Sequence, residues 1–273
     1  MALLASRARV LRCYALGETS LIAVLLTEEA GLLRAVGKGA RELKSRLRGL
    51  LAPGTALDVQ LYLKPRGGLH LFREASSRRP LPRAESGLTP LCLRLAALEL
   101  VMTTTEEGEA MAGLFPLLED FLALYETETP PTPGWSAFLA FEAGLLALHG
   151  LAGDAELERC GLCGGPLRET DLRFLPGEGV FACGAHPEPG MALAPVERDW
   201  LLSVFRAQPA ALAAREMPEA VRVRGGRVLH LALSRHLPGY RSPRSLAVLD
   251  SARPGDANAP DIEHAHEVGE EES

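Results

Sequence analysis

Long apolar runs are missing from this chain of 273 residues. A membrane-spanning helix needs roughly 20 consecutive apolar residues, and no stretch approaches that length. The first 16 residues are interrupted by Arg7, Arg9 and Arg12, so we expect no signal peptide there. With 47% hydrophobic and 23% charged residues, the composition is ordinary for a globular protein of two or three domains. We predict a cytoplasmic protein without membrane contact.

Cysteines and aromatic residues are also few. An odd number of cysteines without a secretory signal argues against a disulfide framework. The five are Cys13, Cys92, Cys160, Cys163 and Cys183. Aromatic residues make up only 5% of the chain, so any binding of nucleic acid should depend more on charge than on base stacking.

Signatures of nucleotide binding and nucleophilic catalysis are absent as well. The stretch from Gly31 to Lys38 resembles a phosphate-binding loop only superficially, because five residues separate Gly31 from Gly37 and Gly39 stands where Ser or Thr is needed. We find no Ser/His/Asp or Cys/His pattern. We therefore predict that the protein is not an enzyme.

Charge is distributed unevenly along the chain. Residues 1–80 carry 14 Lys or Arg against 6 Asp or Glu, whereas residues 81–249 carry 14 against 21. Residues 250–273 carry one Arg and eight acids. A basic front end on an acidic body is expected of a protein that presents one face to nucleic acid.

The basic charge is concentrated between Lys38 and Arg48, where five cations and one acid occupy eleven residues. Each phosphate that a cation neutralises releases condensed counterions, so such spacing favours nucleic acid. A solvated surface loop is the alternative. The cations are Lys38, Arg41, Lys44, Arg46 and Arg48.

Five short β-compatible runs surround this basic segment and predict a small barrel in residues 1–80. An OB-type barrel, which often binds oligonucleotides, fits five strands in some 75 residues. An SH3-like barrel would have a similar pattern. The expected strands are Arg9–Leu16, Leu21–Thr27, Leu32–Gly37, Ala56–Leu63 and Leu69–Arg73.

After a proline-containing linker, Arg78–Pro90, the apolar period becomes helical and predicts a helical domain over residues 81–250. Thr89 is the expected N-cap of its first helix. The acid-rich residues 251–273 are expected to be a disordered acidic tail. Further helices are expected at Glu109–Tyr125, Trp135–His149, Pro195–Ala207, Ala210–Glu216 and Gly226–Leu237.

A metal site is predicted at about residues 155–190, inserted in the helical domain. Cys160 and Cys163 form a C-x2-C knuckle, Cys183 and His186 form a C-x2-H knuckle, and 19 residues lie between the two knuckles. Four such ligands match tetrahedral zinc, and a closed shell indicates one structural Zn²⁺. A zinc deaminase would also need an H-x-E motif before its C-x-x-C motif. Here His186-Pro187-Glu188 follows it.

A second basic region extends from Arg222 to Arg244 and contains no acid. It would lengthen a phosphate track if it folds near the barrel, and otherwise it is a charged helix flank. Its first three arginines, Arg222, Arg224 and Arg227, are further candidates for DNA contact.

Taken together, these segments resemble the RecO family of bacterial recombination mediators over most of the chain. The front end is the most specific part, and Leu16 departs from the Tyr or His that often precedes the family's Gly-Glu. The acidic tail has no evident counterpart. The matching segments are Gly17-Glu18-Thr19-Ser20, Leu26–Leu32, Val36–Arg41, Lys44–Gly49 and Leu51-Ala52-Pro53.

The resemblance implies an N-terminal OB-fold, a helical domain with a zinc module, and no turnover. It also implies a nucleoid-associated protein that binds single- and double-stranded DNA and anneals complementary strands. With RecR, such proteins help RecA to replace single-stranded-DNA-binding protein. Position by position, it makes the five cations between Lys38 and Arg48 the first candidates for DNA contact. An adaptor that works mainly through protein contacts is the alternative.

Overall fold

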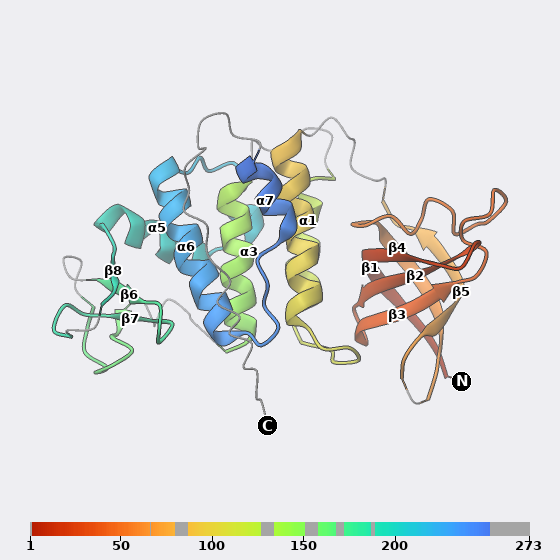
Figure 1. Ribbon diagram of the computed structural model, residues 1–273, viewed down its shortest axis with the longest axis horizontal. Coiled ribbons are helices and arrows are strands. Elements are labelled where there is room, and N and C mark those ends of the chain that lie inside the picture. Colours follow the sequence, from red (N-terminus) through yellow and green to blue (C-terminus); the bar gives the residue numbers. More distant parts are fainter. Residues whose placement is uncertain are drawn as a thin grey trace, which may run out of the picture.

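The computed structural model describes residues 2–65, 67–79, 87–126, 134–150, 158–167, 172–186 and 189–251. A β-barrel forms one end of the elongated molecule, helices form its centre, and a small sheet lies at the other end (Figure 1). Helix α1 (Leu88–Thr104) is the helix drawn next to the barrel. No helix in the described part is long and apolar enough to cross a membrane.

The barrel closes in the order β1-β2-β3-β5-β4. Strands β3 and β5 pair in parallel, and the other neighbours are antiparallel. Its interior holds apolar side chains such as Val10, Leu25 and Leu57. This topology confirms the OB-type barrel over the SH3-like alternative. The strands are β1 (Ala2–Leu16), β2 (Ser20–Thr27), β3 (Gly31–Gly37), β4 (Ala56–Leu63) and β5 (His70–Ser77).

Strand β1 begins seven residues before the predicted start at Arg9 because it serves two partners. Its first half, from Ala2 to Arg9, pairs with β4, and its second half, from Ala8 to Leu16, pairs with β2. The register shifts between Val10 and Arg12, where the strand changes partner. A long bent strand of this kind lets a five-stranded sheet close on itself.

The central helices pack around one continuous apolar core. Phe121, Phe138 and Phe141 are fully buried there, and the ring of Phe121 lies 5.1 Å from that of Phe141 and 6.0 Å from that of Phe138. Besides α1, the helices are α2 (Leu114–Ala123), α3 (Trp135–Leu148), α5 (Pro195–Arg206), α6 (Glu219–His236) and α7 (Arg244–Ser251).

Several helix boundaries differ from the predicted ones. Helix α1 starts directly after Gly87, so Thr89 lies inside it and is not the N-cap. Helix α2 starts at Leu114 rather than Glu109, because Gly113 has a φ of 90° and ends a turn. The helix predicted at residues 210–216 is a short 3₁₀ turn, Pro209–Leu212.

Helix α6 begins seven residues before the predicted Gly226, so both Gly225 and Gly226 lie inside a helix. Two adjacent glycines disfavour helix in isolation. Gly225 is buried, and a Cβ there would be in ordinary contact with Leu139 and Leu201. Packing of α6 against its neighbours therefore overrides the low helix propensity of the glycine pair.

The barrel and the helices share apolar and ionic contacts. Leu11, Val24, Leu26 and Leu32 of the barrel belong to the same core cluster as the helices. Arg9, which is 0% exposed, forms ion pairs with Glu119 and Glu126 and donates to the Gly54 carbonyl at 2.9 Å. The two domains therefore pack directly on each other.

The small sheet has the order β7-β6-β8 and rests on the helical core. Phe174 and Phe181 pack with ring centroids 5.3 Å apart, and the His236 Nε2 atom of α6 lies 3.1 Å from the Gly179 carbonyl. The strands are β6 (Arg173–Leu175), β7 (Val180–Ala182) and β8 (Met191–Ala192). Most of the predicted linker, and the predicted tail after Ser251, lie outside the described residues.

Candidate nucleic-acid interface and metal centre

The basic run lies in the connection between β3 and β4 and is built from successive turns. The Glu42 amide donates to Gly39, the Ser45 amide to Glu42 and the Arg48 amide to Ser45, at 3.0 to 3.2 Å. Ala40 and Leu51, which are 2% and 4% exposed, anchor the connection in the barrel core. Local turns and two apolar anchors thus fix a segment that has no helix or strand.

All five cations of this connection are exposed. Within the described residues none of them forms an ion pair, and Glu42 is the only acid in the run. Arg41 donates from Nη1 to the Gly17 carbonyl at 3.1 Å, which holds the connection against the turn between β1 and β2. The connection therefore presents uncompensated positive charge to solvent.

The three arginines predicted on α6 are in a different environment. Arg222 pairs with Glu219, stacks over Trp135 at 4.6 Å, and its side chain is only 10% exposed. Arg224 lies 3.5 Å from a Glu197 carboxylate oxygen. Arg227 is exposed and forms no ion pair with a described residue. Of the three, Arg227 has the guanidinium that is most available to a ligand.

The barrel contains three aromatic residues, Tyr14, Tyr62 and Phe72, which are the side chains on which a base could stack, and Tyr62 is half-buried. Phe72 is 8% exposed and belongs to the barrel core, so it is not available to a base. Tyr14 is 43% exposed and carries the Arg12 guanidinium 4.9 Å above its ring. The exposed aromatic contact surface of the barrel is correspondingly small.

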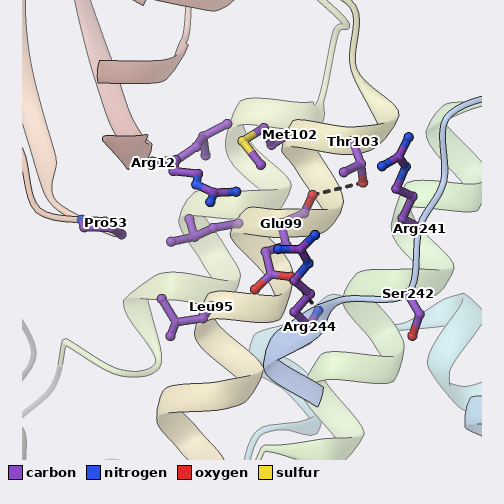
Figure 2. Close-up of a pocket in the computed structure, with 11 residues that line it drawn as sticks. Arg12, Pro53, Leu95, Glu99, Met102, Thr103, Arg241, Ser242 and Arg244 are labelled. Carbon is purple, nitrogen blue, oxygen red and sulfur yellow. Dashed lines mark hydrogen bonds between the residues drawn. The ribbon is translucent and has the colours of Figure 1, made fainter. Parts of the chain in front are cut away.

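Arg12 was expected only to interrupt the apolar N-terminal segment, and no ligand contact was predicted for it. It lines a pocket between the barrel and α1 together with Arg241 and Arg244 (Figure 2). More than 200 positions separate Arg12 from the other two, so no local pattern could have revealed the cluster.

The four predicted metal ligands lie together at the small sheet. Their ligand atoms are all within 4.8 Å of one another. The Gly164 amide donates to the Cys160 carbonyl at 2.8 Å and closes the first knuckle. Gly161 is required there, because a Cβ would lie 2.7 Å from the Cβ of Val180. The residues are Cys160, Cys163, Cys183 and His186.

The chemistry of these groups fits a metal ion. Burial raises the pKa of Cys160, but backbone amides that donate to its sulfur outweigh this effect and lower the pKa to about 6. The Cys183 amide is 3.5 Å from that sulfur. His186 Nε2 is buried without a hydrogen-bond partner, as expected for a ligand nitrogen. The cluster can therefore hold a metal ion with four ligands.

The barrel with its cationic connection, the helical domain and the cysteine-histidine cluster define a modular protein of the nucleic-acid-binding class. Residues 1–81 match the family model described as Recombination protein O N terminal, and residues 89–245 match Recombination protein O C terminal. The chain belongs to the RecO family of DNA repair proteins.

Curated relatives carry the name DNA repair protein RecO. The one from Anaeromyxobacter dehalogenans strain 2CP-C is 30% identical over 87% of this chain and 91% of its own length. The one from Rubrobacter xylanophilus is 30% identical over 93% of this chain and 100% of its own length. The one from Myxococcus xanthus is 32% identical over 81% of this chain and 87% of its own length.

Proposed function

We propose that this protein is a non-catalytic recombination mediator that binds single- and double-stranded DNA and anneals complementary single strands. With RecR, it promotes loading of RecA onto single-stranded DNA that is covered by its binding protein. We expect it to act in the cytoplasm at the nucleoid. Membership of the RecO family supports this proposal.

The observation that carries the DNA-binding part is the set of five exposed cations between β3 and β4. The five cations are part of the β3–β4 connection, which is held in place by hydrogen-bonded turns and by apolar anchor residues. Their charges are therefore presented as a group. Because their partners would be phosphates, we expect strong salt dependence and weak sequence preference.

Annealing requires that two strands approach each other despite their mutual repulsion. The connection with Lys38–Arg48 supplies one cationic surface, and Arg227 on α6, with its neighbours Arg222 and Arg224, supplies a candidate for another. A protein that holds backbones and leaves base edges free lowers the repulsion without blocking pairing.

The metal centre is proposed to hold one structural Zn²⁺. Three thiolates and one imidazole would fill a tetrahedral shell and leave no position for a reacting water. Bound zinc would tie the two knuckles together and fix the small sheet on α6.

The test is a titration of a labelled single-stranded oligonucleotide, followed by fluorescence anisotropy across a salt series. A variant with Lys38, Arg41, Lys44, Arg46 and Arg48 changed to Gln is compared with the wild type. If all five contact phosphates, the log-log salt slope flattens by about 3.5, at roughly 0.7 per contact on a single strand.

Arg73→Gln is a control, because Arg73 is an exposed barrel arginine outside the basic connection. Unchanged binding by the five-residue variant would remove the connection as the DNA surface. Absence of DNA binding by the wild type, together with tight binding of RecR, would support the adaptor function instead.

A further inference from the structure

A pocket of about 400 Å³ lies where the barrel meets the helical domain. Its lining residues come from the barrel (Arg12 and Pro53), from α1 (Leu95, Glu99, Met102 and Thr103), from the segment before α7 (Arg241 and Ser242) and from the first residue of α7 (Arg244) (Figure 2). This pocket is called the interdomain cleft below.

Three arginines, Arg12, Arg241 and Arg244, line the interdomain cleft. Arg12, Arg241 and Arg244 are all exposed, and none forms an ion pair with a described residue. Among the described residues, the one acid that lines the cleft is Glu99, and both oxygens of its carboxylate accept hydrogen bonds. One accepts from the Arg244 amide at 2.6 Å, and the other accepts from the Ser245 hydroxyl. The positive charge of the cleft is therefore in excess.

The floor of the cleft is apolar. Leu95, Leu98 and Met102 of α1 line it together with Leu11 and Pro53 of the barrel. An apolar floor next to guanidinium groups suits a ligand that has both anionic groups and a flat ring with apolar faces. A nucleotide has this combination, because its phosphate binds guanidinium bidentately and its base packs on apolar surface.

We propose that the interdomain cleft is a binding site for single-stranded nucleic acid, in which Arg12, Arg241 and Arg244 bind backbone phosphates and one base packs on the α1 floor. This inference rests on the proposed DNA-binding function. It adds a contact site to the basic connection and to α6, and it gives Arg12 a role. The barrel and the helical domain then contribute to one strand site jointly.

Continuity with the basic connection favours nucleic acid over an acidic peptide as the occupant. Pro53, at the edge of the cleft, belongs to the same β3–β4 connection as Lys38–Arg48. A strand that follows this connection is led from the five exposed cations towards the three guanidiniums. A short acidic peptide would need only the cleft itself.

The experiment again uses the full chain, a labelled single-stranded oligonucleotide and a salt series. The triple variant Arg12→Gln, Arg241→Gln, Arg244→Gln should flatten the log-log slope by about 2, at roughly 0.7 per phosphate. The single variant Arg241→Gln should flatten it by about 0.7. Arg73→Gln is its control, because Arg73 is exposed, lies outside the cleft and outside both basic regions, and loses the same charge.

A second readout locates the strand directly. Photo-crosslinking with an oligonucleotide that contains 5-iodouracil should label the peptide that contains Met102, whose thioether lines the cleft. A thermal unfolding curve first establishes that the triple variant is folded. If the wild type binds DNA and the folded triple variant keeps the wild-type salt slope, the cleft does not bind the DNA strand. A Glu-rich peptide that binds the wild type but not the triple variant, with unchanged DNA slopes, would assign the cleft to a protein partner. If the wild type itself does not bind DNA, the proposed function fails first.

Discussion

Arg9 links three parts of the molecule through one buried guanidinium. It forms ion pairs with Glu119 of α2 and with Glu126, and it donates to the carbonyl of Gly54. Glu126 is also paired with Arg79 at 2.7 Å. A buried charge of this kind is tolerated only because it is paired and hydrogen-bonded, so loss of one partner leaves the others uncompensated.

Replacement of Arg9 by Met should therefore lower the free energy of unfolding by about 3 kcal/mol or more. Arg7→Met is the matched control. Arg7 pairs with Glu28 on the surface, where both side chains are at least 31% exposed, and its loss should change the free energy by less than about 1 kcal/mol. Urea denaturation measures both. Equal effects of the two substitutions would contradict this assignment.

Glu142 is a carboxyl group buried in α3, and it lines a second pocket with Trp135, His230 and Tyr240. Desolvation raises its pKa from 4.5 to about 8. The folded state then binds this proton more tightly than the unfolded state does. The contribution to stability is complete below about pH 4.5 and is lost as the pH rises towards 8.

The variant Glu142→Gln removes this titration. We expect it to be more stable than the wild type at pH 8.5, by on the order of 3 kcal/mol, and to differ little at pH 5. Urea denaturation at both pH values measures the difference. A wild type and variant with parallel pH profiles would mean that Glu142 is ionised at neutral pH in the folded protein.

The sequence predicted that Cys160, Cys163, Cys183 and His186 lie together but did not predict the contacts of Arg9 or Arg12, and the reason is spacing. Two knuckles, each with two residues between its ligands, form a local pattern that by itself predicts a shared metal ion. Arg9 meets its carboxylates 110 and 117 positions further along the chain. Only the packing of the barrel on α2 brings these groups together.

At the scale of elements, the hairpin turn between β2 and β3 touches the connection between α1 and α2. Gly31 has a φ of 64°, and a Cβ there would lie 1.9 Å from the carbonyl oxygen of Glu109. The Gly108 amide donates to the Leu32 carbonyl at 2.8 Å, which holds the two segments together. The turn is therefore part of the contact between the domains.

The substitution Gly31→Ala should separate this contact and lower the free energy of unfolding by more than about 2 kcal/mol. Gly17→Ala is the control, because Gly17 has a φ of 62° but no atom within 4 Å of an added Cβ. It should cost about 1 kcal/mol, the strain of the left-handed backbone alone. Thermal or urea unfolding distinguishes them, and similar losses would show that the steric contact is unimportant.

The strands were largely predictable because alternation and turn residues mark them locally, as in Ala56–Leu63, whose bounds match β4. Helix α6 was harder, since Gly225 and Gly226 signal a break that tertiary packing overrides. The early half of β1 was missed because its pairing with β4 depends on residues some 50 positions away.

At the scale of the whole molecule, the module formed by the small sheet and the cysteine-histidine cluster shares the apolar core of the helical domain. Phe174, Leu175 and Phe181 belong to the same apolar cluster as the helices. Loss of a structural metal from the module should therefore weaken the helical domain as well as the module. The barrel has a second, separate cluster.

If the cluster holds the proposed structural Zn²⁺, treatment with a zinc chelator should lower the thermal unfolding temperature by several degrees, because a metal bound only to the folded state stabilises it. Cys163→Ser should reduce the metal content below one ion per chain. Cys13→Ser should leave it unchanged, since Cys13 lies in the barrel and donates to the Leu51 carbonyl. Elemental analysis and calorimetry measure these outcomes. A chelated protein with unchanged stability would exclude a structural role for the metal.

The hydrogen bond from Arg9 to Gly54 has a consequence for how this protein can evolve. Gly54 lies near the end of the connection that carries the exposed cations, and Arg9 is the same residue that joins the barrel to α2. A mutation that alters the junction between the barrel and α2 should therefore also shift the position of the cationic connection. The domain junction and the position of the cationic connection therefore depend on the same residue. We expect that an evolutionary change at the junction requires a compensating change in the connection.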